Sequence, residues 1–275
     1  MVERVTITIK KDILRRIDSM VDGREVRNRS HAIENLLFKS LSKNGLDTAL
    51  VMAGGEGVNL RPITYELPKP LIPIRGKPVL EHQINMLKRY DITNILLAVN
   101  YMGDKIREYF GDGKKFGVDI TYITEDKPMG TAGPISLAKD FINKSFVLLN
   151  VDTLMNPNIH EMYEFHKRHK KLATVLLTTT DDTTQFGVVK MRGNQVLKFV
   201  EKPSIKNAPS KLINAGLCIF DQSIVNMVPK RKMMIEELFS KLSREEQLVG
   251  FLHDGTTFDI GTNKGYEKAI KEWKG

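Results

Sequence analysis

A glycine-rich loop directly after a short apolar run is the feature that most constrains the fold. Residues 49–52 are apolar and predict a buried strand, and Gly54, Gly55 and Gly57 follow it. Glycine accepts positive φ and lets the backbone come close to a ligand. Main-chain N–H groups in such a turn bind anions, and Lys69 adds a mobile positive charge. The stretch therefore predicts an anion-binding site at the end of a strand.

Strand-like and helical runs alternate from residue 48 onward. Strands are predicted over 49–52, 95–100, 120–123, 147–150 and 174–178, with helices such as 80–90 and 159–170 between them. This alternation predicts an α/β fold with a mixed, mostly parallel sheet, helices on both faces and ligands at the carboxyl ends of strands. The first loop is neither G-x-G-x-x-G nor a Walker A sequence, which disfavours dinucleotide oxidoreductases and P-loop proteins.

The glycine-rich stretch belongs to a longer motif. Residues 53–78 read AGGEGVNLRPITYELPKPLIPIRGKP. They resemble the signature of sugar-1-phosphate nucleotidyltransferases, roughly G-G-x-G-T-R-L-x-P-x-T followed by P-K-P-L and G-K-P. Further matches occur in order over residues 48–270: GTAG at 130–133, FVLLNVD at 146–152, FGVV at 186–189, EKP at 201–203, NAG at 214–216 and FDIGT at 258–262. The resemblance implies the Rossmann-like nucleotide-diphospho-sugar transferase fold.

The resemblance also implies a chemistry. In this family a sugar-1-phosphate oxygen attacks the α-phosphorus of a nucleoside triphosphate, and pyrophosphate leaves. The catalytic residues would be Lys69, Asp152 and Asp259, and the two aspartates would hold Mg²⁺, which prefers oxygen ligands. The implied nucleotide-binding residues are Ala53, Gly54, Gly55, Gly57, Asn59, Gly130 and Thr131. The implied sugar-phosphate-binding residues are Gly187, Glu201, Lys202 and Asn214.

Two positions of the motif depart from the family. Val58 stands where threonine is usual, and Asn59 stands where the family carries its phosphate-binding arginine. Losing one such donor typically costs about 10²–10³ in rate. Arg61 is close in sequence, but active relatives often carry arginine at that position as well, so it is a poor substitute. The sequence therefore leaves open whether this chain is an efficient enzyme.

The first 43 residues lie outside this motif. Residues 4–10 alternate and predict a half-exposed strand, followed by two amphipathic helices. A segment this small cannot bury a core alone, so it should dimerise through strand pairing. Its order and the RNRSHAIENLL start of its second helix resemble ribbon-helix-helix DNA-binding proteins, which read the major groove with a β-ribbon. That resemblance implies base contacts by Arg4, Thr6 and Thr8, and phosphate contacts by Asn28, Arg29 and Ser30.

The charge of this segment agrees with either of two roles. It holds 10 Lys and Arg against 6 Asp and Glu, which suits DNA but also suits a solvated dimerisation arm. We therefore expect a DNA-binding or dimerisation domain at 1–43, a linker at 44–47 and a nucleotidyltransferase-like domain at 48–275. The single cysteine, Cys218, excludes an internal disulfide, and no apolar run is long enough to span a membrane. These features indicate a cytoplasmic protein.

Three functions fit the sequence. The favoured one is a DNA-binding transcription regulator whose large domain binds a nucleotide, sugar phosphate or nucleotide sugar as effector, with catalysis weakened by Asn59. The alternative is an active Mg²⁺-dependent sugar-1-phosphate nucleotidyltransferase whose N-terminal arm serves dimerisation or autoregulation. A structural dimer that uses neither site is the third. The expected partners are operator DNA, the nucleotide or sugar ligand and a second copy of the chain, whereas the base and the sugar are not readable.

Overall fold

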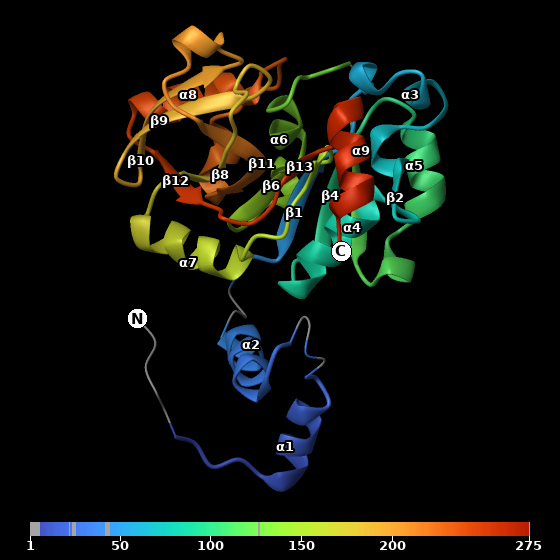
Figure 1. Cartoon of the computed structure of the whole chain (residues 1–275), viewed down its shortest axis with the longest axis vertical. Coiled ribbons are helices and arrows are strands. Elements are labelled where there is room, and N and C mark those ends of the chain that lie inside the picture. The colour runs from blue at the N-terminus through green and yellow to red at the C-terminus, as the bar shows by residue number, and fades with distance from the viewer. Residues whose placement is uncertain (1–5, 22, 24–25, 42–44, 126, 275) are drawn as a thin grey trace. The chain divides into compact units, whose positions relative to one another are not determined.

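The chain divides into two compact units. A computed structural model of the protein describes residues 6–21, 23, 26–41, 45–125 and 127–274. The units are Met1–Gly45 and Leu46–Gly275 (Figure 1). Within the described residues, no helix is both long and apolar enough to cross a membrane.

A nine-stranded sheet forms the centre of the large unit. Its strands lie in the order β5 (Asp119–Thr124), β4 (Asn94–Val99), β1 (Thr48–Met52), β6 (Phe146–Asn150), β11 (Leu212–Phe220), β8 (Ala173–Thr179), β12 (Leu248–Leu252), β10 (Gln195–Glu201) and β9 (Gly187–Arg192). The first four run parallel, and so do β8 and β12, whereas β6–β11, β11–β8, β12–β10 and β10–β9 are antiparallel. The predicted mixed sheet is confirmed, but "mostly parallel" describes only its first half: among the later strands only β8 and β12 are parallel, and β9 and β10 pair directly as an antiparallel hairpin.

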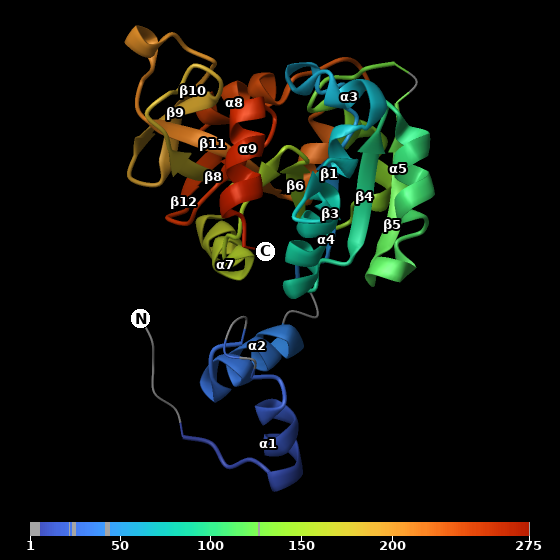
Figure 2. The same cartoon turned by 45° about the vertical axis from the view of Figure 1, so that its right-hand side comes forward.

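The strands predicted from apolar runs are present because both faces of the sheet are covered. In β1, Ala49 and Val51 belong to one hydrophobic core, and Leu50 belongs to a second core on the opposite face. A strand buried on both faces reads as a continuous apolar run instead of an alternating one. Figure 2 shows β5, β4, β1 and β6 side by side in this arrangement.

Helices cover the two faces of the sheet. Buried residues of α4 (Val79–Arg89), α5 (Gly103–Phe110) and α7 (Ile159–His169) belong to the first core. Residues of α6 (Gly133–Leu137) and α8 (Ile235–Arg244) belong to the second. In α4 the buried positions include Val79, Leu80, Gln83, Ile84 and Leu87, the spacing of one helical face.

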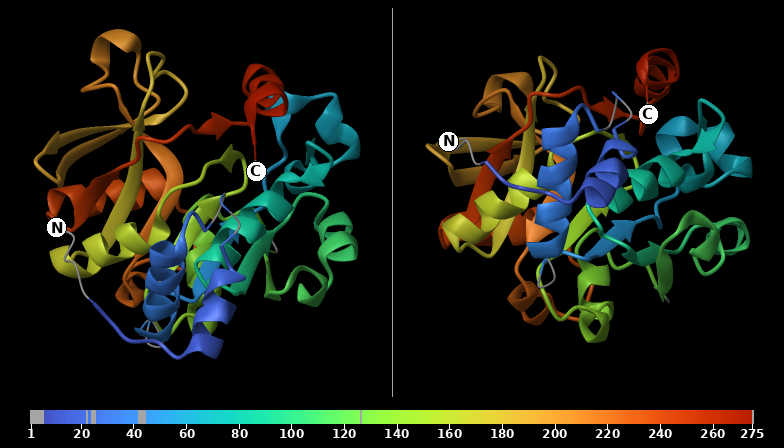
Figure 3. Two further views of the ribbon diagram at one scale, coloured as in Figure 1. Left: turned by 60° about the horizontal axis from the view of Figure 1, so that its bottom comes forward. Right: turned by 90° about the horizontal axis from the view of Figure 1, so that it is seen from below.

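A third, smaller core ties the C-terminus to the first half of the chain. Two short strands, β7 (Thr153–Leu154) and β13 (Phe258–Asp259), pair antiparallel. α9 (Asn263–Glu272) follows, and Figure 3 shows it in red beside the segment that contains α3 (Ile63–Glu66), β2 (Pro73–Ile74) and β3 (Lys77–Pro78). The core consists of Ile74, Val79, Leu154, Phe258, Ile260, Ala269 and Trp273. Residues far apart in sequence are thereby fixed at one end of the sheet.

The described residues of the small unit form two helices, α1 (Lys11–Asp18) and α2 (Arg29–Leu41). Ile17 and Ala32 are buried, whereas Ile7, Ile13 and Leu37 are exposed. Residues 6–10, which belong to the strand predicted over residues 4–10, form no strand in the single chain, and Arg4 lies outside the described residues. A strand requires backbone hydrogen bonds to a neighbour, and within the described part of the single chain no strand lies beside these residues.

Candidate active site

The glycine-rich loop leaves β1 and turns back over the ends of the sheet. Ala53 N–H donates to Ala98 O at 2.8 Å, and Gly54 O accepts from Tyr101 N–H at 3.2 Å. Gly57 has φ +66°, and Thr64 Oγ1 donates to its carbonyl at 2.8 Å. A Cβ atom on Gly57 would lie 2.7 Å from Thr64 Cγ2. Only glycine fits this turn, for reasons of both conformation and space.

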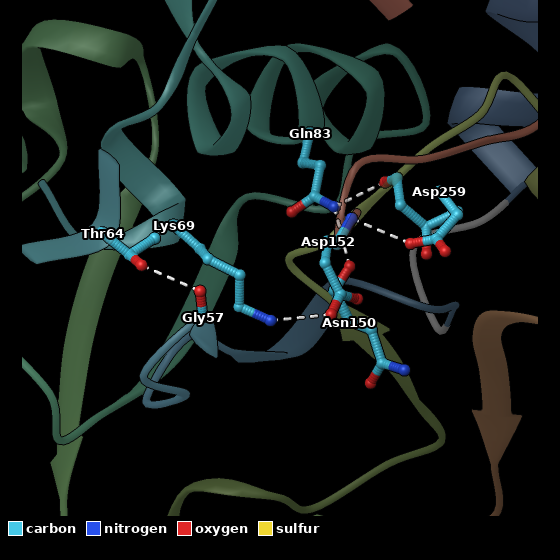
Figure 4. Close-up of polar contacts among 9 residues, drawn as sticks. Gly57, Thr64, Lys69, Gln83, Asn150, Asp152 and Asp259 are labelled. Atoms are coloured by element: carbon cyan, nitrogen blue, oxygen red, sulfur yellow. Dashed lines mark hydrogen bonds and ion pairs between the residues drawn. The ribbon is translucent and has the colours of Figure 1, made fainter. Parts of the chain in front are cut away.

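Lys69 lies beside this loop and points to the end of β6. Its Nζ donates to Asp152 Oδ2 at 2.7 Å, with 14% of the lysine side chain exposed (Figure 4). Asp152 is in the turn that joins β6 to β7. The two residues are 83 positions apart, so the order of the strands brings them together, not local sequence.

The short antiparallel pair of β7 and β13 places Asp259 next to the turn that contains Asp152. It pairs with Thr153, and Ile260 N–H donates to Asp152 O at 2.8 Å. A Cβ atom on Gly261 would lie 3.0 Å from Asp259 Oδ1 and 3.5 Å from Asp152 Oδ2, so the two carboxylates face one small space. Burial raises the pKa of Asp259, and the charge of Asp152 adds to this, while the hydrogen bond from Gly261 N–H (2.8 Å) opposes it.

These groups line one cavity of about 230 Å³. Six of the predicted site residues form its walls: Gly57, Asn59, Lys69, Asp152, Lys202 and Asp259. The remaining wall residues are Val58, Gln185, Gly261 and Thr262. Gln185 and Thr262 were not predicted as site residues, although Gln185 directly precedes the FGVV motif and Thr262 is the last residue of FDIGT. The cavity therefore joins the anion-binding loop, two cations and two carboxylates.

The carboxylates of Asp152 and Asp259 suit a metal site that substrate phosphates and water complete. Across the described residues, no group of three or more His, Cys, Asp or Glu side chains could hold a metal ion. Mg²⁺ is usually bound by one or two carboxylates together with substrate phosphates and water. The pair formed by Asp152 and Asp259 fits such a nucleotide-dependent site and does not fit a metal site made of protein ligands alone.

The predicted sugar-phosphate residues come from neighbouring strands. Glu201 pairs with Gly187 across β10 and β9, and Lys202 Nζ lies 4.0 Å from Glu201 Oε1. Burial raises the pKa of Glu201, and the nearby charge of Glu236 adds to this shift. Asn214 Oδ1 accepts from Gly216 N–H at 2.9 Å. Of this group only Lys202 lines the cavity.

The predicted base loop lies outside the cavity walls. Thr131 Oγ1 accepts from Ile235 N–H at 2.8 Å and so contacts the start of α8. Ala53, Gly54, Gly55 and Gly130 likewise do not line the cavity.

Sequence reasoning missed a buried carboxylate near the glycine-rich loop. Glu125 directly follows β5 and is 9% exposed. Its Oε2 accepts from Met129 N–H at 2.6 Å, and its Oε1 would be 3.5 Å from a Cβ atom on Gly54. Burial raises the pKa of Glu125, and the Met129 N–H opposes this shift. Its place at the carboxyl end of a predicted strand was the available signal.

Among the described residues predicted to bind DNA, Arg29 forms contacts that the prediction did not include. Thr6, Thr8 and Ser30 are exposed, and Asn28 Oδ1 accepts from His31 N–H at 2.9 Å at the start of α2. Arg29, however, forms two hydrogen bonds with Asp18, at 2.6 and 2.8 Å. Its guanidinium therefore serves an ion pair between α1 and α2, which occupies donors that a phosphate contact would need.

Comparison with known proteins identifies the large unit. Residues 48–274 match the family model described as nucleotidyl transferase. Mannose-1-phosphate guanyltransferase beta-A of Xenopus laevis is 36% identical over 225 residues, which are 79% of this chain and 62% of that protein. The mannose-1-phosphate guanyltransferase of Neurospora crassa is 38% identical over 226 residues, again 79% and 62%. The chain thus spans about 62% of the length of these curated relatives.

Solved structures agree on the fold. A structure from Bacillus anthracis assigned as a glucose-1-phosphate thymidylyltransferase has a TM-score of 0.74 at 28% identity, covering 82% of this chain and 94% of that one. A UDP-glucose pyrophosphorylase solved with UDP-glucose has a TM-score of 0.73 at 18% identity, covering 83% and 98%. The second likeness shows the fold alone.

These findings overturn the favoured sequence interpretation. The interpretation as a DNA-binding transcription regulator that only binds its nucleotide or sugar ligand as an effector is wrong, because relatives 35–38% identical over most of the chain are named as mannose-1-phosphate guanylyltransferases. They favour the alternative, an active enzyme. The matched region begins at residue 48, after the segment on which the DNA-binding interpretation depended. The chain belongs to the nucleotidyl transferase family.

Proposed function

We propose that the large unit is an active Mg²⁺-dependent sugar-1-phosphate nucleotidyltransferase, which converts a nucleoside triphosphate and a sugar-1-phosphate into a nucleotide sugar and pyrophosphate. The observation that carries this proposal is the meeting of Lys69, Asp152 and Asp259 in one cavity beside the glycine-rich loop. A cation and two carboxylates at the end of a parallel sheet suit the binding of a metal-bound triphosphate.

Cationic and N–H groups of the site bind the phosphates of the substrates, and its carboxylates bind the metal. N–H groups of the glycine-rich loop and the ammonium of Lys69 hold the triphosphate, and Lys202 attracts the sugar-1-phosphate. Asp152 and Asp259 would hold Mg²⁺, which supplies positive charge to the phosphate oxygens. An oxygen of the sugar phosphate forms the new bond to the α-phosphorus as the bond to the β-phosphate breaks. Positioning and charge stabilisation account for most of the acceleration in such a transfer.

We further propose GTP and mannose-1-phosphate as substrates, following the names of the relatives. The buried carboxylate of Glu125 supports guanine, because guanine alone among the common bases presents two adjacent donors, N1–H and N2–H, on its Watson–Crick edge. Release of pyrophosphate from a panel of triphosphates and sugar-1-phosphates tests the proposal. No release from any pair would refute the enzymatic reading, and a preference for another base would refute only the choice of GTP.

Replacement of Glu125 by glutamine should weaken the preference for guanine. The amide of the variant offers one donor where guanine needs an acceptor, so we expect kcat/KM for GTP to fall roughly 10–100-fold, as for loss of a two-point base contact. The values for ATP and UTP should change much less. Steady-state kinetics with each triphosphate measure this, and Glu267→Gln is the matched control, since Glu267 lies on α9 outside the cavity walls with 68% of its side chain exposed. Equal losses for all triphosphates would assign Glu125 a structural role.

For the small unit we propose a role in self-association. Ile7, Ile13 and Leu37 are exposed apolar side chains on a unit too small to bury a full core. Pairing of residues 6–10 between two chains, as in a ribbon-helix-helix dimer, would cover part of this apolar surface. Sedimentation equilibrium should therefore give a dimer or larger assembly for the whole chain and a smaller species after removal of residues 1–45. The same mass per assembly for both would exclude this role.

A further inference from the structure

Gln83 reaches from α4 to the turn that carries Asp152. The residue is 2% exposed, on the buried face of the helix. Its Nε2 donates to Asn150 O and to Thr153 O, both at 2.8 Å (Figure 4). The two N–H groups of one amide thereby satisfy the carbonyls at both ends of the turn.

That turn sets the position of both acidic residues of the cavity. Asp152 lies between the two carbonyls that Gln83 holds. Thr153 begins β7, the strand that pairs with Asp259 in β13. Any shift of the turn would therefore move Asp152 directly and Asp259 through its strand partner.

Packing alone does not account for a glutamine at this position. Gln83 Oε1 is buried and has no hydrogen-bond partner among the described residues. An unsatisfied buried acceptor is costly, and an apolar side chain of the same size would avoid that cost. The benefit of a glutamine at this position therefore lies in the two hydrogen bonds that Gln83 Nε2 donates.

We propose that Gln83 is a positioning residue for the Asp152–Asp259 pair. It fastens the β6–β7 turn so that the two carboxylates face each other across the space where a metal-bound phosphate would lie. Groups that orient metal ligands in this way typically change metal affinity or activity about 10–100-fold when they are removed. The inference rests on the proposed function of the same cavity.

The test uses Gln83→Met, which keeps the length of the side chain and removes both donors. The probe is Mn²⁺ with inorganic pyrophosphate, a product of every reaction of this class, whichever base and sugar are used. Water-proton relaxation should show Mn²⁺–pyrophosphate binding weakened about 10–100-fold relative to the native chain. The thermal unfolding midpoint should fall as well, because Asn150 O and Thr153 O lose their shared donor. A residue with a merely structural role would lose stability and keep Mn²⁺–pyrophosphate binding, as the control below should.

Ile84→Val is the matched control, because Ile84 is the next residue of α4, is fully buried and packs in the first core. It should lower the unfolding midpoint and leave Mn²⁺–pyrophosphate binding within about twofold, as for a core substitution that does not touch the site. Gln83→Glu is the second variant, which keeps the volume and, when ionised, offers no donor. Native-like binding in both Gln83 variants would overturn the inference alone. Absence of Mn²⁺–pyrophosphate binding in the native chain would overturn the proposed function and the inference with it.

Discussion

Replacement of Asp152 by asparagine is expected to lower kcat for pyrophosphate release about 10³-fold or more, because a catalytic metal supplies several kcal/mol of charge stabilisation. Asp152 faces the cavity together with Asp259 and accepts a hydrogen bond from Lys69 Nζ at 2.7 Å. Asparagine keeps the shape and one oxygen but removes the charge that attracts Mg²⁺. Asp259→Asn should act in the same way, since its carboxylate faces the same space.

Steady-state kinetics at a range of Mg²⁺ concentrations check this expectation. The losses in the two single variants should not add in the double variant, because both act through one metal. Asp181→Asn is the control: this carboxylate is 97% exposed and pairs with Lys211 away from the cavity. If either cavity variant kept more than a tenth of the native kcat, the two aspartates could not be the metal ligands.

The parts of the site that depend on local sequence, the strand and the glycine-rich loop, were predicted from the sequence. The strand before the glycine-rich loop was predicted because a strand buried on both faces has to be apolar throughout, as Ala49, Leu50 and Val51 are. The role of Gly57 followed from its residue type, since its turn leaves no room for a Cβ atom. The two aspartates were identified only through resemblance to a family. Asp259 is placed in the site by a strand pair only two residues long, and such a pair is too short to produce a periodic pattern in the sequence.

What the sequence did not predict depends on contacts that residue type does not encode. The partners of Gln83 are main-chain carbonyls 67 and 70 residues away, and any residue supplies a carbonyl. On an amphipathic helix a buried glutamine looks like an ordinary packing position. The strand predicted over residues 4–10 is absent from residues 6–10 of the single chain for a different reason: its alternating pattern is compatible with a strand, but a strand also needs a neighbour, and residues 6–10 have none within the described chain.

Replacement of Asn59 by arginine is expected to raise kcat by about 10²–10³, the usual value of one well-placed donor to developing charge. Asn59 lines the cavity two residues after Gly57, so a longer cationic side chain there could reach the triphosphate. The wall residues include two cations, Lys69 and Lys202, and Lys69 is paired with Asp152. Arg61 does not fill the place: it lies 3.4 Å from Glu56 and over the ring of Tyr65, outside the cavity walls.

The gain should appear in kcat more than in KM, because the charge that an arginine stabilises grows as pyrophosphate leaves. Asn59→Lys is the matched control, since it adds the same charge without the planar fork that binds two phosphate oxygens at once. We expect it to recover only part of the arginine effect in single-turnover measurements with GTP and mannose-1-phosphate. A kcat for Asn59→Arg equal to or below the native value would mean that other groups already stabilise the leaving pyrophosphate, the main-chain N–H groups of the glycine-rich loop first among them.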